Sequence, residues 1–283
     1  MNLATVIVIT KNHSKFLKKC LTNLVNQSYS NYEIIIVDDN SSDDTNQLVN
    51  SFNSSKVSYY LNSENKGLAA LRNFGILQAK GEYIFFTDAD CIPTTHWIEE
   101  GMKILVKDKY AGVEGKTIAE SQDFGASTHF VENINGGQYQ TCNIAYKKKY
   151  LYRVNMFNEK YNVAYEDLDL AIRIKKQLPI AFNENMLVLH QLVPWNFKRL
   201  ISNSLRGRNK VLLIKEHHYE FILTFRILEI NYLVQVVFPV ALLLYCRIRS
   251  PRDLMILPLL YLRSVLHRII IWKTSISEKI FVL

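Results

Sequence analysis

The fold follows from residues Tyr83–Pro93, which read YIFFTDADCIP. The stretch begins with aromatic and β-branched residues, which are typical of a buried strand. It ends in two carboxylates, Asp88 and Asp90, separated by one small residue. Alternate residues of an extended chain point the same way, so both acids can address one cation, directly or through a water. Such oxygen ligands suit Mg²⁺ or Mn²⁺; the alternative is that Asp-Ala-Asp forms an exposed turn after the strand.

The chain before this stretch alternates between short apolar runs and amphipathic segments. The apolar runs predict strands of a parallel sheet at Ala4–Thr10, Tyr32–Asp39, Val57–Leu61 and Tyr83–Thr87. The segments between them predict helices over Lys15–Val25, through Leu48, Val49 and Phe52, and over Leu68–Ala79. This alternation predicts an α/β fold, with a mostly parallel, Rossmann-like sheet flanked by helices on both faces.

Two of these strands end in carboxylates, at Asp38–Asp39 and at Asp88–Asp90. In an open α/β sheet, ligands bind beyond the carboxyl ends of the strands. The first strand is not followed by G-x-G-x-x-G, and the chain contains no G-x-x-x-x-G-K-[ST] loop. These absences exclude the dinucleotide-binding and P-loop types of site. Acids at one sheet edge indicate instead a nucleotide held by carboxylates and a metal.

Length and composition set the outer limits of this interpretation. A chain of 283 residues that is 48% hydrophobic can form one large α/β domain with an appendage. Its four cysteines are scattered without zinc-type spacing or a disulfide framework, which fits a reducing, cytosolic setting. The apolar run near the N-terminus has no basic leader or cleavage site, so we expect a strand there and not a signal peptide.

Four blocks of this sequence resemble the inverting family 2 glycosyltransferases, which have the GT-A fold. They span about residues 4–190 and read VIVITKN, EIIIVDDNSSDDT, NKGLAALRNFGILQAKGEYIFFTDADCIP, and CNIAYKK followed by FNEKYNVAYEDLDLAIRIKK. The resemblance implies a GT-A catalytic domain over residues 1–194. It also implies Mn²⁺- or Mg²⁺-dependent transfer of a sugar from a nucleotide-diphosphate donor, expected to be a UDP-sugar. The implied acceptor is a polysaccharide or a lipid-linked saccharide.

The resemblance assigns roles on the donor side of the site. Asp39 resembles the acid that accepts a hydrogen bond from the pyrimidine base, and Thr10 and Asn12 resemble the lip around that base. Arg72 resembles the cation near the ribose and diphosphate; the alternative is an ordinary helix-surface arginine.

The metal site implied by the resemblance is the D-x-D motif formed by Asp88 and Asp90, with Asp90 as the direct ligand. His190, after the apolar strand Met186–Leu189, either contributes to the metal or diphosphate site or is structural. A divalent ion at this point would stabilise the charge that builds on the leaving diphosphate.

The catalytic and acceptor residues implied by the resemblance lie further along the chain. Glu166 and Asp167 match the family's acidic pair, and an inverting transfer needs one carboxylate as general base. We choose Asp167 first and Glu166 second, and we interpret Asp169 as an acid that caps its helix. Asn143 is expected to line the acceptor pocket.

The last third of the chain, residues 195–283, is predicted to be a helical, membrane-associating region. Six basic residues and no acidic one lie between Lys198 and Lys215, with apolar residues on one helical face. Such a helix is typical of a membrane surface, so we expect a membrane and no nucleic acid as partner. The apolar segments Ile230–Tyr245 and Leu254–Trp272 are short or interrupted, and a hairpin would place three arginines outside, against the positive-inside tendency. Interfacial or re-entrant segments at the cytoplasmic face of the cell membrane fit better; the alternative is a soluble module that forms a homo-oligomer.

Two other functions remain as alternatives. A sugar-nucleotide nucleotidyltransferase should carry a glycine-rich signature after the first strand, where this chain has TKNHSK. A saccharide-binding or scaffolding relative without activity should have lost its acids, but Asp39, the D-x-D pair and Glu166–Asp167 are all present.

Overall fold

The computed structural model describes residues 2–64, 67–217 and 230–280. The chain forms two compact units. The first comprises Met1–Glu120, Phe130–Asn162 and Glu166–Gln191, and the second comprises Ser121–His129, Val163–Tyr165 and Leu192–Leu283. The second unit therefore includes two short segments that lie, in sequence, within the expected catalytic region 1–194.

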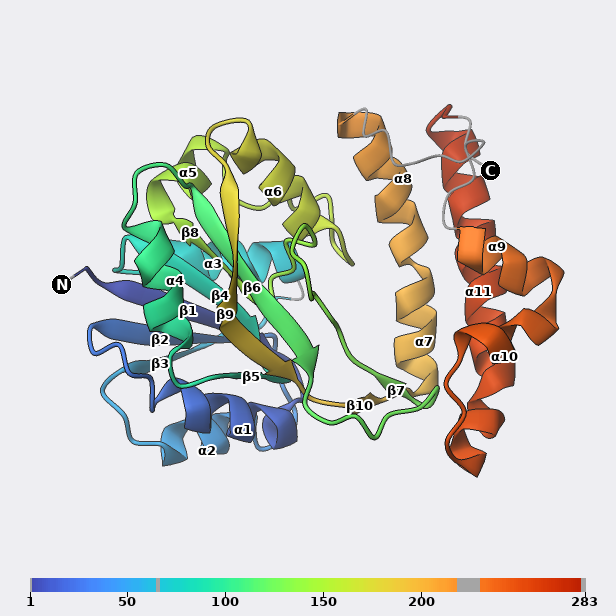
Figure 1. The fold of residues 1–283 in the computed structure, drawn as a ribbon, viewed down its shortest axis with the longest axis horizontal. Helices are drawn as coiled ribbons and strands as arrows, with labels where there is room; N and C mark the ends of the chain where they lie inside the picture. Colours follow the sequence, from blue (N-terminus) through green and yellow to red (C-terminus); the bar gives the residue numbers. More distant parts are fainter. Residues whose placement is uncertain (1, 65–66, 218–229, 281–283) are drawn as a thin grey trace. The chain divides into compact units, whose positions relative to one another are not determined.

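The first unit is built on an eight-stranded sheet with the order β3-β2-β1-β4-β8-β6-β9-β5 (Figure 1). Its parallel half consists of β1 (Ala4–Thr10), β2 (Tyr32–Asp38), β3 (Val57–Leu61) and β4 (Tyr83–Asp88). All seven residues of β1 are buried, as expected of a strand covered on both faces. The prediction of these four strands is confirmed to within one residue.

The other half of the sheet mixes strand directions. β8 (Ile144–Lys147) runs antiparallel to β4 and to β6 (Gly112–Ala119), and β9 (Ile180–His190) runs parallel to β6. The short strand β5 (Cys91–Pro93) pairs antiparallel with the end of β9. That pairing sets Cys91 opposite His190, so the residue after the D-x-D motif meets a residue almost a hundred positions away.

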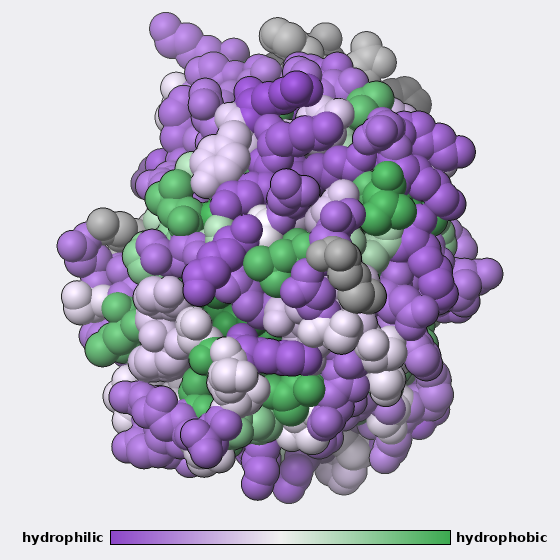
Figure 2. All heavy atoms as spheres, turned by 90° about the vertical axis from the view of Figure 1, so that its left-hand side faces the viewer, coloured by the Kyte–Doolittle hydropathy of each residue, from purple (hydrophilic) through white to green (hydrophobic). Residues whose placement is uncertain are grey.

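Helices cover both faces of this sheet, as predicted (Figure 1). One face packs against α1 (Ser14–Leu24), α2 (Thr45–Ser51) and α4 (Trp97–Leu105). The other packs against α3 (Leu68–Gln78), α5 (Lys148–Arg153) and α6 (Glu166–Lys175). In α1 the buried side chains include Leu17, Leu21 and Leu24, which recur at helical spacing. On the face seen in Figure 2, hydrophilic side chains predominate and apolar ones lie in small patches.

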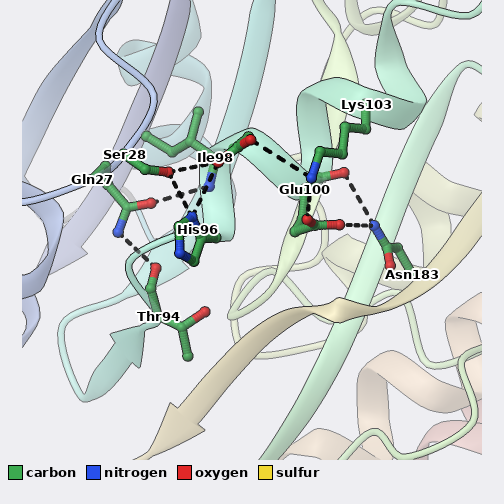
Figure 3. Close-up of polar contacts among 9 residues, drawn as sticks. Gln27, Ser28, Thr94, His96, Ile98, Glu100, Lys103 and Asn183 are labelled. Atoms are coloured by element: carbon green, nitrogen blue, oxygen red, sulfur yellow. Dashed lines mark hydrogen bonds and ion pairs between the residues drawn. The ribbon is translucent and has the colours of Figure 1, made fainter.

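A polar network holds the start of α4, whose N-cap residue makes no side-chain cap (Figure 3). Gln27 from the segment after α1 accepts a hydrogen bond from the Ile98 backbone N–H at 3.1 Å and donates one to the Thr94 carbonyl at 2.8 Å. One otherwise unsatisfied donor of the helix end is thereby satisfied. At the other side, the Asn183 amide on β9 donates to the Glu100 carbonyl at 3.1 Å. Since α4 follows β5, these bonds hold the segment after the D-x-D motif in place.

The second unit is mainly helical. It has α7 (Phe197–Ser204), α8 (Arg206–His217), α9 (Ile230–Val237), the 3₁₀ turn η2 (Pro239–Ala241), α10 (Leu242–Tyr245), α11 (Pro251–Ser277), and the strands β7 (Thr128–His129) and β10 (Val193–Pro194). The basic stretch that was predicted as one amphipathic helix is divided into α7 and α8 at Leu205. The apolar segment Ile230–Tyr245 is likewise broken before Pro239, which cannot continue the hydrogen bonding of a helix.

Among the described residues, only α11 is long and apolar enough to cross a membrane, by length and composition alone. Its 27 residues extend about 40 Å, and 28% of its most apolar window is buried. A capping box formed by Ser250 and Asp253 starts the helix. The Asp253 carboxylate also accepts backbone hydrogen bonds from Ser127 at 2.8 Å and from Arg249 at 3.0 Å. The helix therefore begins at a fully bonded buried acid.

Candidate active site

The carboxyl ends of β1, β2 and β4 meet at one edge of the sheet. In the strand register, Thr10 is opposite Asp38 and Ile9 is opposite Asp88. A cleft of about 210 Å³ opens there, and its walls include Thr10, Asp39, Arg72, Asp88 and Asp90. The cleft thus brings together five residues that the sequence analysis assigned to donor or metal binding.

The two acids at the end of β2 differ in their surroundings. Asp38 is buried, and its carboxylate accepts hydrogen bonds from the hydroxyls of Ser41 and Tyr59, both at 2.6 Å. Asp39 lines the cleft and pairs with the Lys11 ammonium at 2.7 Å. Asp38 therefore holds the loop that follows β2, and Asp39 is the acid available to a ligand. Lys11 is a cleft cation that the sequence analysis missed, although it directly follows the first strand.

Asn12 lies between the cleft residues Lys11 and His13 but is not itself among the residues that line the cleft. Its φ of 53° lies in the left-handed region, where asparagine is tolerated better than most residues. Its backbone N–H donates to the Ser41 hydroxyl and its side-chain oxygen accepts from the Ser42 N–H, each at 2.7 Å. Asn12 therefore ties the loop after β1 to the loop after β2. Thr10 has a buried hydroxyl oxygen without a hydrogen-bond partner among the described residues.

Arg72 is buried and is not a surface arginine of α3. Its guanidinium donates to Glu166 at 2.6 Å and to Asp88 at 3.3 Å. Burial by itself would lower the pKa of Arg72, but the carboxylates of Glu166 and Asp88 outweigh it and raise the pKa. Arg72 therefore remains a cation that joins the D-x-D motif to the start of α6. Arg72 and Glu166 are 94 positions apart in the sequence, so no local sequence pattern predicts this contact.

Asp90 and His190 form the second part of the acidic site. Their Oδ1 and Nε2 atoms are 3.7 Å apart, and the His190 Nδ1 lies 2.8 Å from the Gln191 carbonyl oxygen. A carbonyl can only accept, so Nδ1 carries a proton, and in the neutral ring the lone pair is on Nε2. Two acceptors, a carboxylate oxygen and an imidazole nitrogen, then face each other, and this arrangement fits a divalent cation. The neighbouring Cys91 thiol also lies in this group, but burial raises its pKa, so it stays protonated and is a poor ligand.

Asp88 lies between these two parts of the site. Burial raises its pKa; Arg72 opposes this, and the nearby Asp90 carboxylate adds to it, so that the pKa is above the usual value for an aspartate. The side chain is still 32% exposed. A cation bound at this point would relieve the repulsion between the two acids, which is the electrostatic situation expected of a metal-binding pair.

The three acids at the start of α6 have different environments. Glu166 is buried and bonded to Arg72, whereas Asp167 is only half-buried. Asp169 is buried and forms an ion pair with Arg173, one turn further along the helix, at 2.5 Å. Glu166 is thus paired with Arg72 of α3, and Asp169 is paired with Arg173 of its own helix. Asp167 is the least buried of the three, and its carboxylate accepts a hydrogen bond from the Leu168 backbone N–H at 2.8 Å.

Asn143 does not join this group. It is buried, its side-chain oxygen accepts from the Trp97 indole at 2.8 Å, and its amide donates to the carbonyls of Lys116 and Met186 at 2.8 and 2.9 Å. These bonds use its oxygen and both amide hydrogens within the protein interior. We therefore leave Asn143 out of the acceptor site and assign it a structural role.

A buried acid that the sequence analysis missed organises the loop before β8. Glu114 accepts hydrogen bonds from the backbone N–H groups of Gly137 at 2.5 Å and Tyr139 at 3.0 Å, and from the Asn133 amide at 3.0 Å. Gly136 and Gly137 have φ values of 78° and 87°, which favour glycine. The glycines therefore let the loop wrap around the carboxylate. Glu114 lies in a strand that reads GVEGKTIA, close to Lys116, so nothing in the local sequence signals that its carboxylate is buried.

A model of the glycosyl transferase family 2 matches residues 5–176. The chain belongs to glycosyltransferase family 2. It is 30% identical over 228 residues to UDP-Glc:alpha-D-GlcNAc-diphosphoundecaprenol beta-1,3-glucosyltransferase WfaP of Escherichia coli, a match that covers 77% of this chain and 90% of WfaP.

Two further relatives bear on the fold and on the extent of the chain. The family 2 chain is 31% identical over 163 residues to glycosyltransferase GlyA of Streptococcus pneumoniae, and this match covers 56% of the chain but only 21% of GlyA. Among solved structures, the mannosyltransferase PcManGT from Pyrobaculum calidifontis in complex with GDP-Man and Mn2+ matches with a TM-score of 0.61 at 18% identity, over 98% of this chain and 73% of that one. The likeness confirms the predicted GT-A fold.

Proposed function

We propose that this family 2 protein transfers a sugar, with inversion, from a nucleotide-diphosphate donor to a saccharide acceptor. The observation that carries the proposal is the buried Arg72, which links Asp88 of the D-x-D motif to Glu166 beside the expected base. Donor-binding and base-bearing segments are thereby held together by charge. In this proposal the donor is a UDP-sugar. Asp39 accepts a hydrogen bond from its pyrimidine base, and Thr10 and Asn12 lie at the rim around that base.

The residues that would hold Mn²⁺ or Mg²⁺ are Asp90, Asp88 and His190. The ion would act as a Lewis acid toward the leaving diphosphate. Arg72 has a separate task. Its guanidinium holds the Glu166 carboxylate in place at 2.6 Å, and its second branch, at 3.3 Å from Asp88, orients the Asp88 carboxylate toward the cleft.

The chemical step requires a proton acceptor for the attacking hydroxyl. Asp167 would take that proton as the new glycosidic bond forms and the bond between the sugar and the diphosphate breaks. Inversion requires attack from the face of the sugar opposite the diphosphate. Glu166 is a poorer choice of base because its buried carboxylate is already bonded to the Arg72 guanidinium at 2.6 Å.

The acceptor is proposed to be a polysaccharide or a lipid-linked saccharide at the cytoplasmic face of the cell membrane. WfaP, by its name, acts on a diphosphoundecaprenol-linked sugar, which supports a lipid-linked acceptor for the present chain. The exposed apolar residues and basic helices of the second unit support a peripheral or interfacial attachment, with α11 as the segment most suited to contact lipid.

Calorimetry of UDP binding in the presence of Mn²⁺ tests the donor site. Asp90→Ala should abolish metal-dependent binding, whereas Asp108→Ala, which removes an acid with 98% side-chain exposure in the same unit, should leave it unchanged. Unaltered binding by Asp90→Ala would refute the assignment of the metal site.

Release of UDP from a panel of nucleotide sugars then tests catalysis, with water as the acceptor when no saccharide is supplied. Asp167→Asn retains the size of the side chain but loses its basicity, so turnover should fall by about 10²–10⁴ at unchanged donor affinity. Normal turnover by this variant would exclude Asp167 as the base.

A further inference from the structure

The second unit contains a pocket of about 240 Å³ whose walls are basic and aromatic. Its walls include Arg206, Arg263, Asn203, His267, Trp195 and Tyr232. The described residues that line the pocket include no aspartate or glutamate. This composition suits an anion attached to a group that can lie against aromatic rings.

The two arginines have aromatic neighbours but no counter-ion within the described part of the chain. The Arg263 guanidinium lies 5.2 Å from the Tyr232 ring and 5.8 Å from the Trp195 ring, and Arg206 lies 5.7 Å from the Tyr165 ring. The Nε of Arg263 is buried and has no hydrogen-bond partner among the described residues. A buried guanidinium donor without an acceptor is costly, and phosphate oxygens are the acceptors that arginine binds best.

The pocket is held in shape by the helices around it. The His267 ring on α11 stacks on Tyr232 of α9 with 4.4 Å between ring centroids, and its Nδ1 lies 3.0 Å from the Ser204 carbonyl oxygen of α7. The Ser264 hydroxyl, also on α11, donates to Gln235 of α9 at 2.7 Å. Helices α7, α9 and α11 are thus bonded to each other, and α11 carries Arg263. Helix α8, which carries Arg206, packs against α11 through Val211 and Ile271, as expected of a formed binding site.

The same unit exposes large apolar side chains. Leu244 is 86% exposed, Met255 is 78% exposed and Val240 is 75% exposed. A free phosphate or nucleotide has no apolar chain that could contact such a surface, whereas a phosphate carried by a lipid has one. An anionic head with a long apolar tail is thus the ligand class that satisfies both features.

We propose that this pocket binds the diphosphate group of a lipid-linked saccharide, the acceptor of the transfer. Arg206 and Arg263 would receive the phosphate oxygens, and the rings of Trp195 and Tyr232 would lie against the sugar or the first units of the lipid. The inference rests on the proposed function, because it assigns that acceptor a place in the protein.

Binding of farnesyl diphosphate to the intact protein tests the proposal. Arg263→Gln and Arg206→Gln should each weaken binding by roughly ten- to a hundred-fold, the effect of losing a hydrogen bond to a charged group. Arg208→Gln is the matched control, since Arg208 is an exposed basic residue on the same helix as Arg206 and should bind as the parent does. Equal affinity in all four proteins would overturn the proposal, provided that their melting temperatures agree.

Two more ligands distinguish the possible sources of the anion. Inorganic pyrophosphate should bind far more weakly than farnesyl diphosphate; equally tight binding would show a site for free anions and overturn the lipid assignment. Vesicles of phosphatidylglycerol should pellet the parent protein and Arg263→Gln equally. A loss of pelleting in Arg263→Gln that matches its loss of farnesyl diphosphate binding would assign the pocket to bilayer headgroups and overturn the acceptor assignment.

Donor binding separates this inference from the function on which it rests. Arg263→Gln should bind UDP in the presence of Mn²⁺ as the parent does, because the donor residues all belong to the first unit. If Asp90→Ala fails to impair UDP binding, the proposed function is wrong whatever the pocket binds. If Asp90→Ala behaves as expected while Arg263→Gln retains farnesyl diphosphate, only the pocket assignment is wrong.

Discussion

Replacing Arg72 by methionine is expected to destabilise the first unit by about 3–5 kcal/mol, the usual cost of removing one partner of a buried ion pair. The structure supplies the reason. Arg72 is 4% exposed and Glu166 is 3% exposed, so water cannot replace the guanidinium, and the carboxylate 2.6 Å away would be left buried and unpaired. Asp88, with 32% side-chain exposure, should contribute the smaller part, because solvent reaches it.

The size of the effect can be checked against the hydrogen bonds. Two bonds between charged groups, each worth about 1.5–3 kcal/mol, give a total of about 3–6 kcal/mol, which agrees with the cost of breaking the pair. For a unit of this size, a loss of about 4 kcal/mol corresponds to a fall in melting temperature of about 8–16 °C.

Urea unfolding followed by tryptophan fluorescence measures this loss. Trp97 is the tryptophan of the first unit, so Trp195→Phe and Trp272→Phe in the parent chain leave a signal that reports on this unit alone. As a control, Lys19→Met breaks the exposed pair with Glu120 and should cost less than about 1 kcal/mol.

A double-mutant cycle with Glu166→Gln separates the ion pair from the packing of the long side chain. If the pair is responsible, the two substitutions together should cost at least about 1 kcal/mol less than the sum of the single effects, because residues in contact couple by about 0.5–3 kcal/mol. An additive result, or a loss of less than about 1 kcal/mol for Arg72→Met, would refute the reasoning.

Two further predictions concern residues outside the cleft. Asn143→Ala should lower the free energy of unfolding by about 1–3 kcal/mol, because it leaves the buried Trp97 indole N–H and two carbonyls without a partner. The affinity for UDP, measured by calorimetry, should stay at the parent value. A loss of affinity without a loss of stability would instead assign Asn143 a binding role. Although burial acts to raise the pKa of Asp253, hydrogen bonds from Ser127, Arg249 and Ser250 lower it below the usual range, so the ionised acid contributes stability above the unfolded-state pKa of about 3.9. That contribution should disappear as the pH falls below about 4. The difference in melting temperature between the parent and Asp253→Asn should therefore shrink below that pH. A difference that stays constant down to acid pH would contradict this.

Much of the candidate site could be predicted from the sequence because its signals are local. A buried strand needs a run of apolar residues, so the ends of β1, β2 and β4 are visible in one dimension, and the acids that follow them must lie at one sheet edge. The pattern did not say which of Asp38 and Asp39 faces the cleft. That depended on Tyr59 of β3 and Ser41 in the following loop, which bind Asp38.

The remaining features depend on contacts between distant parts of the chain. Arg72 lies on α3, and from the sequence alone it could be a surface arginine of that helix. In the folded protein, Glu166 at the start of α6 lies 2.6 Å from it. His190 reaches Asp90 only because β5 pairs with the end of β9, and a three-residue strand has no periodicity to detect. Asn143 lies in a block resembling the family, but Trp97 and two carbonyls occupy its amide group in the interior. The sequence by itself determined which chemical groups end the strands; tertiary packing decided their partners, because hydrogen bonds and ion pairs are satisfied in space and not along the chain.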